Sequence, residues 1–377
     1  MWTTNGLYQT ADTLNGNNAA QAAAGPVFPN VLGAPVAGTA SASTVQYVVP
    51  NLKTPYSQQG TFAIERQLTR DINATASYIW SRGTQLYSVV DVNAPAASGS
   101  ITYTIDNVSG SPVSTFTTPV YAGARPNPKY GAVYQDGNDI DSYYNALALT
   151  VSKRFTHGLQ GLFSYTWSHE IDDGQGGGTS ALFFNSIPNT YNGNFRFDQG
   201  SGTLDQRHRA VISFIWMPAI THRSGAFYRY VVNNWQLASI TSLSTGHVAG
   251  SESVRVTSSA ISGALSTSTL NGFTGSSRAP FLPVNSLYLP PIYREDARIS
   301  KIIPLGKEGS ARNLYFNFEA FNLLNGTEFT GISTQGFTAS GLVITPTPAA
   351  FGVGNSDTAN PDGSLSRHLQ LSLRFIF

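Results

Sequence analysis

The sequence has no cysteine among its 377 residues. This absence excludes a disulfide framework, a thiolate metal site and a cysteine nucleophile. Charge is also scarce, because Asp, Glu, Lys and Arg make up 11% of the chain, against about 25% in an average soluble protein. The formal net charge is only +1, so no electrostatic basis for binding nucleic acid exists.

Long apolar runs are missing as well. The longest, residues 210–220, has 11 residues and contains a serine and a proline, whereas a transmembrane helix needs about 20. The first ten residues lack the basic and apolar regions of a signal peptide. If the protein is exported, we expect its leader to lie outside this sequence.

Aromatic and small residues are abundant. The chain contains 21 Phe, 18 Tyr and 36 Gly, and aromatic residues form 12% of it. Disordered chains combine high charge with few aromatics instead. The composition therefore indicates an all-β protein with long polar loops.

Alternation with a period of two residues recurs along the chain, which is typical of β-strands with two different faces. The alternating stretches are about 10–14 residues long, and a tilted strand needs roughly 9–11 residues to cross a bilayer. Nine strands are predicted: 58–68, 72–82, 143–155, 159–170, 207–217, 230–243, 293–303, 312–322 and 366–377.

The two faces of these strands differ in chemistry. In residues 312–322, Leu314 and Phe316 share one face, and Asn317 and Glu319 share the other. Large apolar side chains are separated from Ser, Thr and Gln in the same way in 143–155, 159–170 and 207–217. A membrane barrel would turn the apolar face outward in one band, which would include Leu147, Leu149, Phe214, Phe316, Phe318 and Leu373.

Short and long connections alternate between the strands. The short ones are 69–71, 156–158, 218–229 and 304–311, and the long ones are 83–142, 171–206, 244–292 and 323–365. A soluble sandwich gives no reason for this order, whereas outer-membrane barrels have short periplasmic turns and long extracellular loops. An aromatic girdle at the membrane surfaces explains three tryptophans near strand ends, Trp80, Trp167 and Trp216.

The direction of the strands predicts an incomplete barrel. If the last strand ends at the periplasm, residues 1–57 form an extracellular, loop-like segment and residues 58–377 the C-terminal part of a transmembrane barrel. Single-chain bacterial barrels have an even number of strands. We therefore expect an antiparallel up-and-down β-barrel of which this chain holds about 9–10 strands, or a missed strand near 42–49. Open edges are costly in lipid, so this part is not expected to function alone.

A family resemblance is carried by six segments in chain order: 51–69, 144–173, 205–216, 294–305, 315–329 and 367–377. Together they resemble the C-terminal barrel of TonB-dependent outer-membrane receptors, of the acidobacterial type with a carboxypeptidase-regulatory-like N-terminal domain. The resemblance implies a barrel of about 22 strands and uptake of large or scarce nutrients such as metal chelates, cobalamin or glycans. The family's plug and TonB box have no counterpart in this sequence. Contact with the TonB complex would therefore need a plug outside it.

The resemblance also implies a role for the last strand. In such receptors, alternating apolar residues and a final aromatic residue form the signal that the barrel-assembly machinery reads. Here these residues would be Leu371, Leu373, Phe375 and Phe377. A purely lipid-facing role for the same side chains is the alternative. The partners expected are therefore outer-membrane lipid and the assembly machinery.

Four charged residues fall on the polar faces within strands, namely Arg154, Arg209, Glu319 and Arg374. An Arg that faces lipid at the midplane costs about 2–4 kcal/mol. The polar face is therefore predicted to line the lumen, where these side chains would pair with each other or with a plug.

Other site chemistry has weaker support. Asp136, Asp139 and Asp141 alternate as calcium ligands do, but the Gly and Glu positions of an EF-hand loop are absent. The segment 168–178 offers further metal-ligand types, namely His169, Glu170, Asp172 and Asp173. A solvated loop rim is favoured in both places. No nucleophile signature such as GxSxG accompanies the six histidines, so no enzyme, metal or cofactor is expected.

Two other protein classes remain open. A soluble or surface-anchored all-β adhesin or glycan-binding module would pack the aromatic faces of two sheets against each other. A passive porin-like channel would need a closed barrel formed from this chain alone.

Overall fold

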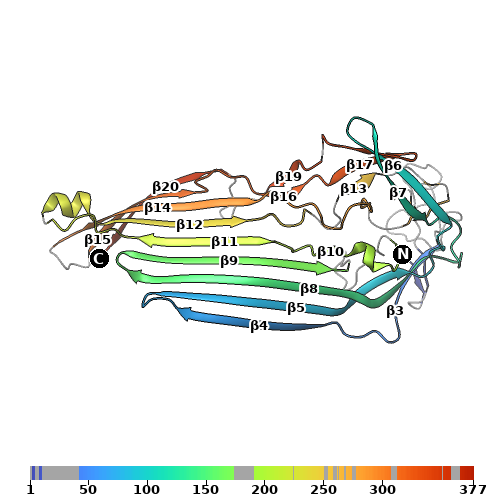
Figure 1. Ribbon diagram of the computed structural model, residues 1–377, viewed down its shortest axis with the longest axis horizontal. Coiled ribbons are helices and arrows are strands. Elements are labelled where there is room, and N and C mark those ends of the chain that lie inside the picture. The colour runs from blue at the N-terminus through green and yellow to red at the C-terminus, as the bar shows by residue number, and fades with distance from the viewer. Residues whose placement is uncertain are drawn as a thin grey trace, which may run out of the picture.

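A computed structural model describes residues 2–4, 8–10, 42–173, 191–223, 225–249, 254–257, 261, 263–266, 269–273, 277–306, 312–349, 351–357 and 366–377. Nine long antiparallel strands lie side by side in chain order (Figure 1). They are β4 (Tyr56–Gln67), β5 (Ile72–Asp91), β8 (Tyr130–Thr156), β9 (Leu159–Asp172), β11 (His208–Trp216), β12 (Trp235–Ser244), β14 (Ile292–Pro304), β15 (Asn313–Phe321) and β20 (His368–Ile376). All nine strands expected from the alternation are confirmed. No helix in these ranges is both long and apolar enough to cross a membrane.

The pairing register confirms that the sheet has two different faces. On the apolar face Phe316 lies opposite Leu373, and on the polar face Thr150 lies opposite Ser164. The six side chains expected in the outward apolar band are all half-buried or exposed: Leu147, Leu149, Phe214, Phe316, Phe318 and Leu373. They do not face a sealed core, which a two-sheet sandwich requires.

Tryptophans mark the two ends of the apolar face. Trp167 lies eight residues along β9 from Leu159, the partner of Trp216. At about 3.3 Å per residue the two rows are about 26 Å apart along the strand, close to the height of about 25 Å of the apolar band in membrane barrels. Trp80, Trp167 and Trp216 each expose at least 40% of their surface, as a girdle at the membrane surfaces requires.

One predicted strand begins later than expected. The segment 230–243 becomes strand only at Trp235, because Tyr228–Val232 forms a single π-helical turn, η2. Asn233 and Thr221 exchange two hydrogen bonds that close this turn, with donor–acceptor distances of 2.8 and 3.1 Å. Asn234 then adopts a left-handed conformation with φ of 64°, which returns the chain to the sheet.

The connection 83–142, expected to be a loop, is partly a continuation of the sheet. β5 and β8 have 20 and 27 residues, and their pairing continues as far as Asp91 opposite Tyr134. The segment near 42–49 is indeed a strand, β3 (Ser43–Val48), but it pairs parallel to this extension of β8. It is therefore not a tenth strand of the up-and-down order. Residues 1–57 also contain the short pair β1 (Trp2–Thr4) and β2 (Tyr8–Thr10).

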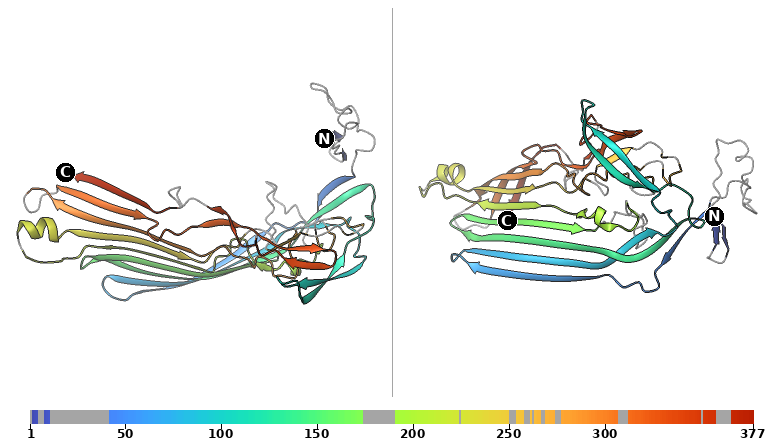
Figure 2. Two further views of the ribbon diagram at one scale, coloured as in Figure 1. Left: turned by 90° about the horizontal axis from the view of Figure 1, so that it is seen from above. Right: turned by 45° about the vertical axis from the view of Figure 1, so that its right-hand side comes forward.

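Three long connections build a second, five-stranded sheet, ordered β13-β17-β18-β6-β7. Its strands are β6 (Gly99–Asp106), β7 (Pro112–Val120), β13 (Arg255–Thr257), β17 (Gln335–Ser340) and β18 (Val343–Pro346). A further pair, β16 (Phe329–Ile332) and β19 (Gly354–Asp357), lies in the last long connection. We call the five-stranded sheet and the segments packed on it the cap. Figures 1 and 2 show the cap at the end of the long sheet away from the C-terminus.

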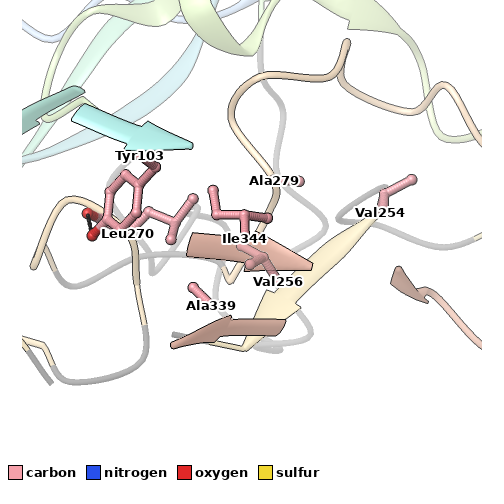
Figure 3. Close-up of a cluster of buried hydrophobic side chains, with 7 residues drawn as sticks. All are labelled: Tyr103, Val254, Val256, Leu270, Ala279, Ala339 and Ile344. Carbon is pink, nitrogen blue, oxygen red and sulfur yellow. Dashed lines mark hydrogen bonds between the residues drawn. The ribbon is translucent and has the colours of Figure 1, made fainter. Parts of the chain in front are cut away.

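The cap has the hydrophobic core of the described structure (Figure 3). Its buried members come from segments far apart in sequence: Tyr103, Val254, Val256, Leu270, Ala279, Ala339 and Ile344. The hydroxyl of Tyr103 donates to the carbonyl of Leu270 at 2.8 Å, so the one buried polar atom of this cluster's aromatic ring is satisfied.

Buried ion pairs hold the long connections in place, one against the sheet and one against another connection. Asp91, at the end of β5, is 1% exposed and lies 2.7 Å from the guanidinium of Arg125. Arg278 lies 2.7 Å from Asp198, at the end of the 3-10 helix η1 (Phe195–Asp198). Since an unpaired buried charge is costly, each pair fixes how its connection is placed.

We predict that Ile344→Ala destabilises the cap by about 2–4 kcal/mol, because Ile344 is fully buried and the truncation leaves a cavity. The measurement is the urea midpoint of cap unfolding, followed by near-ultraviolet circular dichroism. Leu342→Ala, two residues away on a side chain 53% exposed, is the matched control. Equal midpoints for the two variants would contradict the assignment of the core.

Candidate functional site

The polar face of the long sheet holds all four charged residues singled out from the sequence. Arg209 lies opposite Thr166, Arg374 opposite Tyr315 and Glu319 opposite Gln370. Arg154 follows Ser152 in the same phase of β8, and Ser152 lies opposite Leu162. The shared face agrees with the alternation. That this face lines a lumen stays a prediction.

Of these four, Glu319 meets an opposite charge. It lies across from Arg298 on β14, with 3.7 Å between Oε1 and Nη1. The other three lie on β8, β11 and β20, which are not neighbours in the sheet. Arg298 was missed by the sequence reasoning, although Arg294, Asp296 and Arg298 alternate in one phase. That alternation was the signal that could have found it.

A cavity of about 670 Å³ opens on the polar face. Its lining includes Arg154 and Gln160 on one side and Arg298 and Glu319 on the other, with Ile240 between them. Its volume lies within the range of small-molecule sites, about 300–1,000 Å³.

A second polar cluster centres on the carboxylate of Asp205, which is 2% exposed. It accepts hydrogen bonds from the backbone N–H of Glu170 at 2.8 Å, from Arg207 Nε at 2.8 Å and from the hydroxyl of Tyr288 at 3.2 Å. Burial alone would raise the pKa of Asp205, but the hydrogen bonds from Glu170, Arg207 and His169 outweigh it and hold the pKa below its usual value.

His169 is part of this cluster and has a defined role in it. Its Nδ1 lies 3.2 Å from Asp205 Oδ1, and its Nε2 lies 3.2 Å from Arg207 Nη2. Arginine only donates, so Nε2 of His169 is the acceptor in its contact with Arg207. His169 thus joins β9 to the segment 202–207 and is not free to ligate a metal through either nitrogen.

The acidic residues after His169 do not converge with it. Asp173 accepts a hydrogen bond of 2.7 Å from Gln199, while Glu170 and Asp172 point to the opposite face of β9 from His169. Within the described ranges, no three His, Asp or Glu side chains gather as a metal site. Residues 174–190, which include the glycine-rich GQGGGTS, lie outside the described residues.

The three aspartates considered as calcium ligands have separate partners. Asp136 accepts from Gln46 at 2.9 and 3.1 Å, Asp139 from Ser88 at 2.6 Å, and Asp141 forms an ion pair of 2.9 Å with Arg82. Through these contacts, the three carboxylates of β8 connect it to β3 and β5.

The last strand presents the residues of the expected assembly signal. Leu371, Leu373, Phe375 and Phe377 are each exposed by more than half, and the rings of Phe375 and Phe377 stack with centroids 5.7 Å apart. β20 pairs with β15 alone among the described strands. Its other edge is therefore open to a further strand.

We predict that Asp205→Asn destabilises the packing of β9 against residues 202–207 by about 1–3 kcal/mol, because the charge-assisted hydrogen bonds to this buried carboxylate are lost. In the unchanged protein the pKa of Asp205 is lowered on folding. Its contribution to stability is therefore full above the unfolded pKa of about 4 and is lost as the pH falls through the lower folded value. Urea midpoints between pH 7 and pH 2.5 measure both effects. Asp173→Asn is the control at a carboxylate that is only half-buried, and a flat profile below pH 4 would contradict the prediction.

Comparison with known proteins gives two findings. A family model described as an outer membrane beta barrel domain matches residues 2–370. Among solved structures, the crystal structure of the outer membrane transporter YddB from Escherichia coli is similar, with a TM-score of 0.39 and 10% sequence identity. That match covers 78% of this chain and 32% of YddB, so the chain spans about a third of the length of that transporter. The comparison with curated proteins finds no match. Because the family model covers nearly the whole chain, the protein belongs to the outer membrane β-barrel domain family and is located in the outer membrane.

Proposed function

We propose that this chain is the C-terminal barrel part of a TonB-dependent outer-membrane receptor of the acidobacterial type, which takes up a large or scarce nutrient. The proposal rests on the family resemblance of six ordered segments and on one structural observation. In the described residues the nine-strand order ends at β4 and β20, and these two strands are not paired with each other.

The two unpaired edges support a larger barrel. A strand edge in hydrocarbon leaves backbone N–H and C=O groups without partners, at a cost of several kcal/mol each. β4 is exposed along nearly its whole length, and β20 is exposed at all but two of its residues. Further strands that pair with both edges would close the barrel and satisfy these groups.

The cap supports a receptor more than a simple pore. A passive channel needs an open mouth, whereas the long connections here pack into one body with its own core and buried ion pairs. Such a body offers a fixed surface for recognising a large ligand before it enters the lumen. In this proposal the chain is not an enzyme. It contacts the TonB complex through a plug on the same polypeptide.

The test is to isolate the mature polypeptide from outer membranes with an antibody against residues 42–57 and to measure its intact mass. We expect a polypeptide with a plug domain before this barrel, and we expect its plug to cross-link to the periplasmic domain of TonB. A mature protein that consists of this chain alone and conducts ions in a planar bilayer would replace the receptor with the porin alternative.

A separate prediction concerns assembly. Deleting Phe377 from the full polypeptide should leave most of it outside the outer membrane, because the final aromatic residue of the signal read by the assembly machinery is lost. Phe155→Ala removes another exposed aromatic side chain, 51% exposed, next to a short turn, and should assemble normally. The measurement is the amount of folded barrel in purified outer membranes. If both variants give equal amounts of folded barrel in the outer membrane, Phe377 is not part of an assembly signal and only faces lipid.

A further inference from the structure

An apolar strip crosses the polar face of the sheet. Leu162 on β9 lies opposite Ser213 on β11, and Ser213 lies opposite Ile240 on β12. In the next row of the same face, Ile215 lies opposite Ala238. Leu162 and Ile240 are 44% and 54% exposed. Exposed apolar side chains grouped on an otherwise polar surface indicate a binding site.

The cavity of about 670 Å³ lies over this strip. Arg154 and Gln160 line it at the β8 and β9 side, and Arg298 and Glu319 line it at the β14 and β15 side. Four strand spacings separate β8 from β14, which at about 4.8 Å each is about 19 Å. The cavity is therefore elongated, with apolar side chains along its floor and a polar group at each end. Two further charged residues line it, and each has its own counter-charge: Lys153 pairs with Asp71, and Asp296 pairs with Arg294.

The two ends differ in charge. Arg298 already has Glu319 as a counter-charge, at 3.7 Å. The side chain of Arg154 makes no ion pair within the described part of the chain, and this exposed residue lines the cavity together with Gln160. The β8 side therefore has an uncompensated positive charge. At the other end, the side chain of Arg298 lines the cavity and is 41% exposed, so its guanidinium can donate to a bound acceptor as well as to Glu319.

We propose that this cavity binds an amphiphilic organic anion. Its carboxylate contacts Arg154 and Gln160, since guanidinium and carboxylate form strong paired hydrogen bonds. Its apolar body lies on Leu162, Ile215 and Ile240, and a polar group at its far end accepts from Arg298. The site goes beyond the proposed receptor function, because it needs only a polar face open to water.

The test uses the full-length protein in lipid nanodiscs and 2-naphthoate as the probe, with binding followed by saturation-transfer NMR and calorimetry. The neutral 2-naphthamide is the matched ligand. We expect naphthoate to bind more tightly than the amide, and Arg154→Gln to weaken naphthoate binding at least about tenfold, equivalent to about 1.4 kcal/mol. Ile240→Ser should weaken both ligands.

The control variants lie on the same face outside the cavity. Arg209→Gln removes a similar charge, and Val211→Ser removes a similar apolar side chain; neither should change binding. The mobility of the unheated protein on SDS gels shows whether each variant is folded. If Arg154→Gln and Arg209→Gln weaken naphthoate binding equally, the effect is general attraction by positive charge and the proposed site is wrong. If the protein binds naphthoate and naphthamide with equal affinity, the cavity is not an anion site. If no probe binds the folded protein, the proposal is wrong. None of these outcomes depends on TonB, so they leave the receptor proposal to its own test.

Discussion

A peptide group in the hydrocarbon of a bilayer has no water to bond to, so each N–H and C=O of a crossing strand must bond to another strand. This constraint accounts for the main sheet. Its nine strands pair in chain order, so each hairpin satisfies one side of its strands before the next strand is added. The constraint also explains the side chains, because a sheet with lipid on one face and water on the other favours the alternation seen along most of its strands. Among the described strands of this sheet, β4 and β20 each have one edge whose backbone groups lack a partner strand. The proposal of a larger barrel rests on these two edges.

Beyond the apolar band, different forces hold the structure. β5 and β8 continue as a ribbon past the level of Trp80, and the long connections gather into a cap with a small apolar core. Three carboxylates, Asp91, Asp198 and Asp205, are buried there, and each has an arginine partner. A buried charge without its partner is costly, so these pairs favour one arrangement of the connections. The cap is thus held by electrostatics as well as by packing.

The polar face of the long sheet carries the cavity proposed as a binding site. Its hydroxyl-rich rows suit water, and its charges would be costly in lipid. The apolar strip of Leu162, Ile215 and Ile240 departs from this chemistry within the cavity between Arg154 and Arg298. A departure from the local pattern that is not needed for folding is where a bound molecule is expected.

The sequence by itself determined the strands of the membrane sheet and the face of each side chain, because a strand between lipid and water needs a strict period of two. The same period of two placed Arg154, Arg209, Glu319 and Arg374 on one face. Arg298 follows this period too, but it was not among the residues predicted. Only the tertiary structure decided the rest: the cap, the parallel pairing of β3, the ion pair between Arg298 and Glu319 and the cavity. These features join residues separated by many positions in the chain, such as Tyr103 with Leu270. No local period records such contacts, because they are set by which connections meet once the sheet has formed.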